Sequence, residues 1–266
     1  MQTSLDRNQS YGFYRHVLET LRQAEIPFLI SGGFALEYFT GISRDIKDLD
    51  IFVLETDIDP ALQALAECGY PTELTFSHWL GKVHDYNRTD YVDLIFSSGN
   101  GLCKVDPTWF ERAVPAEVFD LAAYLCPPEE MIWQKAFIME RERYDGADVA
   151  HLIRAQSHAL DWQRLVDLFG PHWRVLLSHL ILFGFIYPAE RSKIPLWVIR
   201  RLLASIDKEL AEPSIRDQIC QGPFLSRLQF RVDTENWGYN DARLTTMSPE
   251  EVVQWTAAAN EKEEKS

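Results

Sequence analysis

The amino-acid sequence predicts an α/β (α+β) protein in which an amino-terminal domain with a sheet precedes a helical carboxy-terminal domain. Residues 28–53 read as a strand, a glycine turn, a helix, a loop and a second strand. Extended segments separated by turn-forming residues then fill residues 70–96. From Asp106 onward the pattern of apolar residues becomes helical, so the carboxy-terminal part is expected to consist of helices.

The first elements lead into the glycine turn. A helix is expected over residues 11–24, because its apolar residues share one face, and Ile26-Pro27 ends it. The short apolar run of residues 28–30 suits a buried strand. Gly32-Gly33 then allows a sharp turn with close approach of the backbone to a ligand. The helix that follows at residues 34–39 leaves backbone N–H groups at this turn for phosphate oxygens.

The next strand opens with two acidic residues. Asp48 and Asp50 are two residues apart, and on a strand such residues point to one face of the sheet. Two carboxylates held this close repel each other unless a cation lies between them, and hard divalent ions take oxygen ligands of this kind. The pair therefore predicts a Mg²⁺ site.

These residues resemble a known signature. Gly32-Gly33, then Arg44, then residues 47–53 (Lys-Asp-Leu-Asp-Ile-Phe-Val) are similar to the motif of the nucleotidyltransferase superfamily related to DNA polymerase β. The resemblance is greatest to the bacterial group that holds the minimal nucleotidyltransferases, the antibiotic adenylyltransferases and the abortive-infection toxins. In that group the approach to the carboxylates often reads Arg-x-Thr-x-Asp-x-Asp, and here Ile46 replaces the threonine.

A third carboxylate is expected on a later strand. Asp93 interrupts the otherwise apolar segment 91–96, where a charge is costly unless it is paired or binds a metal. The superfamily places a third acidic residue in such a position, as a ligand or a base, and the resemblance therefore supports Asp93. Asp90 lies nearer the preceding turn and is the weaker alternative.

The resemblance also implies a fold and a nucleotide site. The fold is a nucleotidyltransferase-type mixed sheet flanked by helices, followed by a helical carboxy-terminal domain. The residues that match the nucleotide-binding part of the motif are Ser31, Gly32, Gly33, Arg44 and Lys47.

The domain boundary is expected between about Gly99 and Ala123, after a Ser/Gly/Asn loop. We therefore expect a nucleotidyltransferase catalytic domain at residues 1–105 and a helical domain at residues 106–266. The first helix after Pro127-Pro128 is expected to run to about Tyr144, and the second to span residues 147–156. The charged tail, residues 261–266, is expected to be disordered.

A second group of polar residues lies at the start of the helical domain. Lys135, Met139 and Arg143 are four residues apart and so share one side of the expected helix. A lysine and an arginine on one face would suit a triphosphate held at the glycine turn, whereas a solvated face with salt bridges is the alternative.

The resemblance bears on this group too. Abortive-infection nucleotidyltransferases carry a Lys-x-x-Ala-x-x-x-Arg helix followed by an Arg-Asp or Asp-x-x-Asp element. In the present chain the alanine, Ala136, directly follows Lys135, and Gly146 separates the acidic residues. The implied matches are Lys135, Arg141 or Arg143, and Asp145 or Asp148.

Composition narrows the classes of function. The chain has 266 residues, of which 46% are hydrophobic and 25% charged, as in a folded globular protein. Its 40 acidic and 26 basic residues give a net charge of −14, which disfavours loose electrostatic association with nucleic acid or an anionic membrane. The sequence lacks a Walker phosphate loop, a Gly-x-Gly-x-x-Gly fingerprint and a Gly-x-Ser-x-Gly elbow, so P-loop ATPases, dinucleotide dehydrogenases and serine hydrolases are disfavoured.

The cysteines and the apolar segments indicate a cytoplasmic location. The four cysteines form no Cys-x-x-Cys pair and no secretory leader precedes them, so reduced thiols are expected. The most apolar run, residues 175–187, is shorter than the ~20 residues that a membrane-spanning helix needs. We expect it to be a buried core helix.

The sequence thus predicts a Mg²⁺-dependent nucleotidyltransferase that moves a nucleoside monophosphate from an NTP to an acceptor with loss of pyrophosphate. Asp48 and Asp50 would bind the metal, and Asp93 would complete the site or take the acceptor's proton. The alternative is a non-catalytic nucleotide-binding or antitoxin-like protein that retains the fold. The expected partners are an NTP and an acceptor of unidentified class, whether small molecule, protein or RNA, with no membrane and a homodimer as the candidate assembly.

Overall fold

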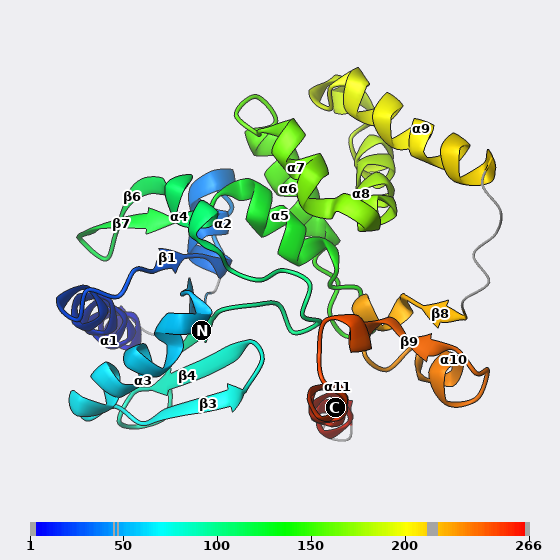
Figure 1. Ribbon diagram of the computed structural model, residues 1–266. Coiled ribbons are helices and arrows are strands. Elements are labelled where there is room, and N and C mark those ends of the chain that lie inside the picture. Colours follow the sequence, from blue (N-terminus) through cyan, green and yellow to red (C-terminus); the bar gives the residue numbers. More distant parts are fainter. Residues whose placement is uncertain (1–3, 45, 47, 212–217, 264–266) are drawn as a thin grey trace. The chain divides into compact units, whose positions relative to one another are not determined.

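A computed structural model describes residues 4–44, 46, 48–211 and 218–263 of the chain. The chain divides into two compact units, residues 1–127 and residues 128–266 (Figure 1). The first unit contains a seven-stranded mixed sheet with helices, and helices dominate the second. The predicted fold class, an α/β (α+β) protein with a mixed sheet followed by a helical part, is therefore confirmed.

The first unit contains four α-helices among its described residues. They are α1 (Ser4–Gln23), α2 (Gly32–Thr40), α3 (Ile58–Glu67) and α4 (Pro107–Glu111), with a 3-10 turn η1 (Glu55–Asp57). The expected helix over residues 11–24 is thus present and begins earlier. Its apolar face is buried as expected, because Val17, Leu18 and Leu21 have no exposed surface.

The strands of the first unit form one sheet in the order β3-β4-β5-β2-β1-β7-β6. Only the pairs β2–β5 and β1–β7 are parallel, and the other neighbours are antiparallel. The strands are β1 (Leu29–Ile30), β2 (Leu49–Phe52), β3 (Thr72–Phe76), β4 (Leu80–His84), β5 (Tyr91–Ile95), β6 (Val114–Val118) and β7 (Leu121–Leu125).

The strand directions bring distant segments to one edge of the sheet. Because β2 and β5 are parallel, their amino-terminal ends lie at the same edge. Because β1 runs antiparallel to β2, the end of β1 and the glycine turn after it lie at that edge as well. The backbone N–H of Ser31 donates to the carbonyl of Asp50 at 2.9 Å, which extends the β1–β2 pairing to the turn.

The division between the units lies after Pro127, whereas the sequence placed the domain boundary near residue 105. The reason is the antiparallel pair β6–β7, which joins the sheet beside β1 in a stretch where helices were expected. Buried and exposed residues alternate along β7, as they do on a strand with one covered face. The only α-helix between residue 106 and Pro127 is the five-residue α4.

The second unit begins with five α-helices. They are α5 (Pro128–Ala136), α6 (Gly146–Gln156), α7 (Trp162–Phe169), α8 (Trp173–Ile186) and α9 (Leu196–Ala211), with 3-10 turns η2 (Gly170–His172) and η3 (Pro188–Lys193). The helix expected over residues 147–156 is therefore present as α6. The helix expected to run to Tyr144 is not, because α5 ends at Ala136.

Among the described residues, one stretch, Trp162–Ile186, is long and apolar enough to cross a membrane by length and composition alone. It is not one continuous α-helix, because η2 separates α7 from α8, and Gly170 has a positive φ of 43°. One side of α8 packs into the second unit through Leu176, Leu180 and Phe183. The expectation of a buried core helix over residues 175–187 is therefore met on one side only, because Ile181, Leu182, Phe185 and Ile186 are exposed.

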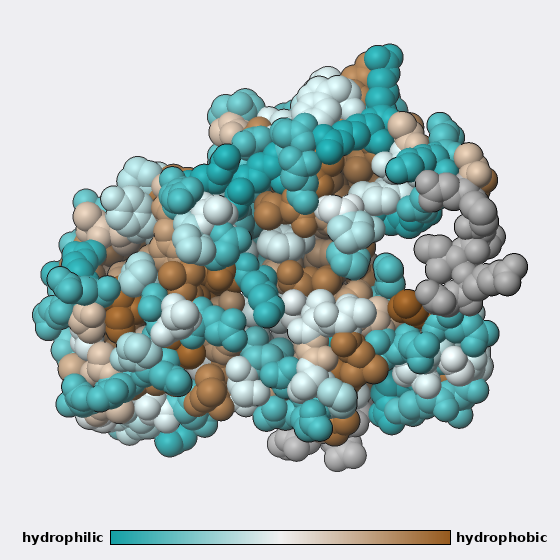
Figure 2. Space-filling model, in the orientation of Figure 1, coloured by the Kyte–Doolittle hydropathy of each residue, from teal (hydrophilic) through white to brown (hydrophobic). Residues whose placement is uncertain are grey.

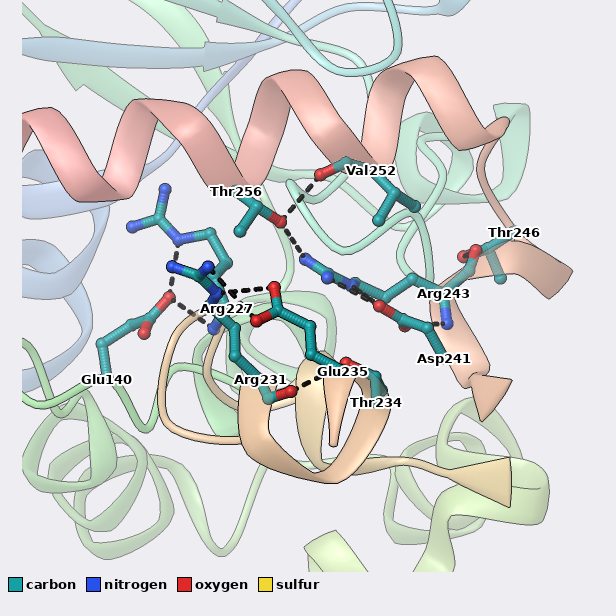
Figure 3. Close-up of polar contacts among 10 residues, drawn as sticks. All are labelled: Glu140, Arg227, Arg231, Thr234, Glu235, Asp241, Arg243, Thr246, Val252 and Thr256. Carbon is teal, nitrogen blue, oxygen red and sulfur yellow. Dashed lines mark hydrogen bonds and ion pairs between the residues drawn. The ribbon is translucent and has the colours of Figure 1, made fainter. Parts of the chain in front are cut away.

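The last part of the second unit is held together by ion pairs. It contains β8 (Ile219–Cys220), η4 (Gly222–Phe224), α10 (Arg231–Glu235), β9 (Asn240–Asp241), η5 (Ala242–Thr245) and α11 (Pro249–Glu263). The guanidinium of Arg243, only 3% exposed, bonds to both carboxylate oxygens of Asp241 and to Thr256 of α11 (Figure 3). Arg227 likewise donates to Glu140 at 2.7 Å. These paired charges attach α11 and the segment before it to the rest of the unit.

Residues 261–266, the predicted disordered tail, overlap the end of α11. The helix continues to Glu263, and residues 264–266 lie outside the described part of the chain. The face of the molecule seen in Figure 2 is mainly hydrophilic, with apolar residues scattered between polar ones. This agrees with the acidic composition of the chain.

Candidate active site

The glycine turn and the acidic strand pack directly on each other in the first unit. Gly32 has a positive φ of 58°, a conformation that favours glycine. A Cβ atom on Gly32 would lie 1.8 Å from Oδ2 of Asp50, so only glycine fits beside this carboxylate. The turn therefore presents bare backbone next to Asp50, as the sequence predicted from the glycine pair.

The second glycine of the pair contacts the residue that departs from the motif. A Cβ atom on Gly33 would lie 2.9 Å from Cγ1 of Ile46, so the isoleucine side chain covers this part of the turn. Ser31 is buried and occupies the N-cap position of α2, but its side chain makes no cap hydrogen bond. The first turn of α2 is thus left without a side-chain cap.

The three predicted carboxylates gather at one edge of the sheet. Asp50 and Asp93 are paired positions on the parallel strands β2 and β5, where neighbouring strands lie about 4.8 Å apart. Asp48 directly precedes β2 and accepts a hydrogen bond from the phenol of Tyr91, at the start of β5, at 3.0 Å. Burial raises the pKa of Tyr91, and the negative charges of Asp48, Asp93 and Asp50 raise it further. All three acids therefore act on this one side chain.

Asp93 has a cationic partner that the sequence did not indicate. Lys82 lies opposite Asp93 in the antiparallel pair β4–β5, and its ammonium forms an ion pair with Oδ1 of Asp93. The ammonium also lies over the ring of Tyr91, 4.1 Å from the ring centroid. Burial raises the pKa of Asp93; the Lys82 ammonium opposes this shift, while the charge of Asp48 adds to it.

Reasoning from the sequence did not identify Lys82 and Tyr91 as part of the candidate site. The signal was present, because a hairpin whose turn lies at residues 85–90 pairs His84 with Tyr91 and hence Lys82 with Asp93. Asp90, the weaker alternative to Asp93, accepts a hydrogen bond from Ser10 of α1 at 2.8 Å. It therefore contributes to the attachment of α1 to the β4–β5 turn.

The carboxylates fit a divalent cation by chemistry and position. Mg²⁺ takes hard oxygen ligands and is usually bound by one or two carboxylates together with water and substrate phosphates. Asp48 and Asp50 can supply two such carboxylates beside the turn that would hold the phosphates. Within the described residues, no three His, Cys, Asp or Glu side chains form a ready cluster for a metal ion. Two carboxylates of this kind suit an ion whose remaining ligands are water and substrate oxygens.

The motif also contains two basic residues, Arg44 and Lys47. Arg44 is exposed in the loop between α2 and β2. Lys47, which the sequence predicted to bind the nucleotide, lies outside the described residues.

The second polar group, in the second unit, has a different geometry from the one expected. Lys135, Met139 and Arg143 do not share a helical face, because α5 ends at Ala136. Residues 137–145 form a loop in which Met139 and Tyr144 make an isolated β-bridge. The N–H of Met139 donates to the distant carbonyl of Leu225 at 3.1 Å, and this contact replaces a continuation of the helix.

Charged residues of this loop and of the helices on either side of it, α5 and α6, nevertheless come together. The ammonium of Lys135 donates to Asp145 at 3.1 Å and to Asp148 at 2.8 Å. Arg143 forms a two-pronged pair with Asp145, with both N–H···O distances 2.9 Å. Burial of Asp145 acts to raise its pKa, but the hydrogen bonds and charges of Arg143 and Lys135 prevail and lower it.

Arg141 and Arg143, which the sequence left as alternatives, are now distinguished. The side chain of Arg141 is 76% exposed and lies 3.8 Å from Glu142. Arg143 instead belongs to the group of Lys135, Asp145 and Asp148. In this structure the basic residues of the loop neutralise acidic residues of the same unit, which is the salt-bridge alternative considered from the sequence.

The comparisons with known proteins agree with the motif. Residues 2–170 match the model of a protein family described as "Uncharacterised nucleotidyltransferase". The match includes all the candidate residues and ends at the junction of α7 and η2. Among curated protein sequences, none matches this chain significantly.

Several solved structures are distantly similar. The lincosamide antibiotic adenylyltransferase LnuA, bound to lincomycin, is 16% identical, with 53% of this chain and 94% of that chain covered and a TM-score of 0.38. The antibiotic-resistance factor ANT(2'')-Ia, in its solution structure, is 13% identical, with 65% and 97% covered and a TM-score of 0.43. An antigenic nucleotidyltransferase-like protein from Paracoccidioides brasiliensis is 15% identical, with 70% and 92% covered and a TM-score of 0.43.

Proposed function

The chain belongs to the nucleotidyltransferase family whose model it matches, and we propose that it transfers a nucleoside monophosphate from an NTP to an acceptor in a Mg²⁺-dependent reaction that releases pyrophosphate. The observation that carries this proposal is the contact between Gly32 and Asp50. It places a backbone turn suited to phosphate oxygens directly beside a carboxylate suited to a metal ion.

In the proposed reaction a hydroxyl oxygen of the acceptor attacks the α-phosphorus of the NTP. The bond from the α-phosphorus to the bridging oxygen breaks, and pyrophosphate leaves with the electron pair. A bound divalent ion would supply stabilisation of the charge on the attacking and leaving oxygens. The backbone of Gly32-Gly33 and the start of α2 would orient the triphosphate.

Asp48 and Asp50 are the proposed metal-holding pair, and Asp93 is the proposed base that takes the acceptor's proton. Two observations favour this division of roles. Asp93 is paired with the ammonium of Lys82. Its pKa is raised by burial, which makes it a stronger proton acceptor than an exposed aspartate.

Tyr91 and Lys82 act in this proposal as positioning residues. The phenol of Tyr91 donates to Asp48 and so fixes the direction of that carboxylate. The ammonium of Lys82 orients Asp93 and contacts the ring of Tyr91. One chain of contacts therefore links the metal-holding acid to the proposed base.

The structure gives less support than the sequence motif to a nucleotide-binding role for Lys135 and Arg143. Their partners are Asp145 and Asp148 of the same unit. To neutralise a triphosphate, either side chain would have to leave its carboxylate partner and bind a phosphate group instead. We retain them as candidate nucleotide-binding residues on the basis of the motif.

The alternative is a non-catalytic nucleotide-binding or antitoxin-like protein with the same fold. It has one structural observation in its favour, since the Lys82 ammonium already neutralises Asp93 without a metal. The two functions differ in what happens to the nucleotide. Both predict that an NTP stabilises the protein, but only the enzyme transfers the α-phosphate to another molecule.

The test is to incubate the protein with each α-labelled NTP, Mg²⁺ and a cell extract, and then to separate RNA, protein and small molecules. Label in one fraction is the expected result, and the fraction identifies the class of acceptor. An Asp48→Asn/Asp50→Asn variant run in parallel shows whether transfer depends on these residues. An NTP that raises the melting temperature without any label transfer would support the non-catalytic alternative.

A cytoplasmic location is part of the same proposal, since the NTP substrate and the reduced state expected for the four cysteines both suit it.

A further inference from the structure

The outer face of α9 is apolar although it has no partner within the described residues. Leu196, Leu203 and Leu210 are seven residues apart, and they are 60%, 45% and 80% exposed. Ile199 and Ile206 lie three residues after the first two leucines and are half-buried at the border of this face. The set follows the a and d positions of a heptad repeat, which is the pattern of helices that pair lengthwise.

The opposite side of α9 already has its contacts. Val198 and Leu202 are buried in the second unit, so α9 does not need its outer face to remain in place. Arg201 pairs with Asp167 of α7, and Glu209 pairs with Arg174 of α8. The heptad face is therefore additional to the face that attaches α9 to its own unit.

Two charged residues flank the heptad face in a particular arrangement. Arg200 and Asp207 are exposed and lie seven residues apart. Each lies four residues after one leucine of the stripe and three residues before the next, so both occupy e positions of the heptad repeat. Within the described residues, the side chain of neither has a hydrogen bond or an ion pair. They are opposite in charge and available on the same border of the apolar stripe.

The positions of Arg200 and Asp207 make this face of α9 complementary to the same face of a second, antiparallel copy. If two copies of α9 pair about a two-fold axis near Leu203, the leucines at the two ends of the stripe exchange places. The same rotation sets Arg200 of each copy against Asp207 of the other, so that the pair occurs twice. In a parallel arrangement the e positions would face g positions, and Leu202, at g, is buried in its own unit.

We propose that this chain forms a homodimer through antiparallel pairing of the outer face of α9 with the same face of a second copy. The paired stripe, from Leu196 to Leu210, spans about 21 Å of helix. The neighbouring helix α8 also exposes apolar residues, including Ile181 and Phe185, which are 58% and 81% exposed. Exposed apolar surface of this kind is typical of an interface. This inference does not depend on the proposed enzymatic function.

The first test measures the molar mass of the full chain by light scattering over a dilution series. The wild-type chain is expected to be a dimer that dissociates on dilution. Leu203→Glu places two like charges at the axis, and it is expected to weaken the dimer by roughly 30-fold or more, the loss expected for a central apolar anchor. Leu74→Glu is the matched control, because Leu74 is 44% exposed in the first unit, and its dimer constant is expected to equal that of the wild type.

The second test keeps the inference testable even if Leu203→Glu is poorly folded. Arg200→Glu and Asp207→Arg are each expected to weaken the dimer, because each sets like charges against each other across the axis. The double variant Arg200→Glu/Asp207→Arg restores opposite charges and is expected to restore the dimer. Restoration supports antiparallel self-pairing, since a different partner protein or a membrane would not compensate in this way.

Two results would overturn the proposal. A wild-type chain that stays monomeric throughout the dilution series has no such interface, and binding of that monomer to anionic vesicles would assign the face to a membrane surface. A dimer that is equally stable in Leu203→Glu and in both single charge variants is formed by another part of the chain.

Discussion

The two units each contain a group of acidic and basic side chains, but the composition of the groups differs. In the second unit, Lys135 and Arg143 face Asp145 and Asp148, so that two cations meet two anions. In the first unit, Asp48, Asp50 and Asp93 gather around Tyr91. Among these acids, Asp93 forms an ion pair with Lys82.

The pKa shifts have opposite signs in the two groups. The pKa of Asp93 is raised, since burial outweighs the effect of Lys82 and the charge of Asp48 acts in the same direction as burial. The pKa of Asp145 is lowered, because the hydrogen bonds of Arg143 and Lys135 outweigh burial. The comparison teaches that the presence of lysine, arginine and aspartate in a motif does not by itself indicate a ligand site.

The largest effect is expected from removal of the acids that would hold the metal. Asp48→Asn and Asp50→Asn are each expected to reduce label transfer from an α-labelled NTP by on the order of 10³-fold, because a bound metal contributes several kcal/mol to the transition state. Asp59→Asn, an exposed aspartate in the first turn of α3, is the matched control and should retain activity. Unchanged transfer in both site variants would show that the acidic group has no role in the reaction.

The next effect tests the contact between the turn and the acid. Gly32→Ala places a methyl group against the Asp50 carboxylate and is expected to reduce transfer by about 10²-fold, the cost of displacing a catalytic group. Gly41→Ala is the control, since Gly41 also has a positive φ, of 70°, but its Cβ would meet nothing within 4 Å. Both variants carry the backbone strain of about 1 kcal/mol. Equal loss of activity in the two would mean that strain, rather than the Asp50 contact, causes it.

A pair of lysine variants compares the two groups directly. Lys82→Met and Lys135→Met each remove the cation from a part-buried ion pair, and each is expected to destabilise the protein by about 2 kcal/mol. Mg²⁺ is expected to raise the melting temperature of Lys82→Met more than that of the wild type, because the ion can replace the ammonium beside Asp93. No such rescue is expected for Lys135→Met, in which Arg143 still pairs with Asp145. Equal rescue of both variants would contradict the distinction between the groups.

The smallest effect is a change in the pH dependence of stability. The lowered pKa of Asp145 means that its contribution is present above the ordinary value of 3.8 and is lost as the pH falls through the folded-state pKa. The difference in unfolding free energy between the wild type and Asp145→Asn should therefore narrow as the pH falls below about 3.8. Denaturant titrations over a pH series measure this difference, and a constant difference across the series would argue against the assigned cause.

Part of the site followed from counting residues along the chain, and part did not. The strand, glycine turn, helix and acidic strand of residues 28–53 are neighbours in sequence, so their periodicity and spacing were sufficient. The Lys82–Asp93 pair was within reach of the same reasoning, because it follows from the register of one hairpin. The boundary after Pro127 was harder to predict from the sequence, because β7 joins the sheet by pairing with β1, which is distant in the chain.

The sequence by itself determined the fold class, the glycine turn and the acidic residues beside it, because each of these depends on residues that are close together in the chain. Only the tertiary structure decided how the charged residues around the end of α5 are arranged. Helix α5 ends at Ala136, the N–H of Met139 beyond it donates to the carbonyl of Leu225, and Lys135 bonds to Asp145 and Asp148. The contact between Met139 and Leu225 joins residues far apart in the chain, and local propensity carries no information about such contacts.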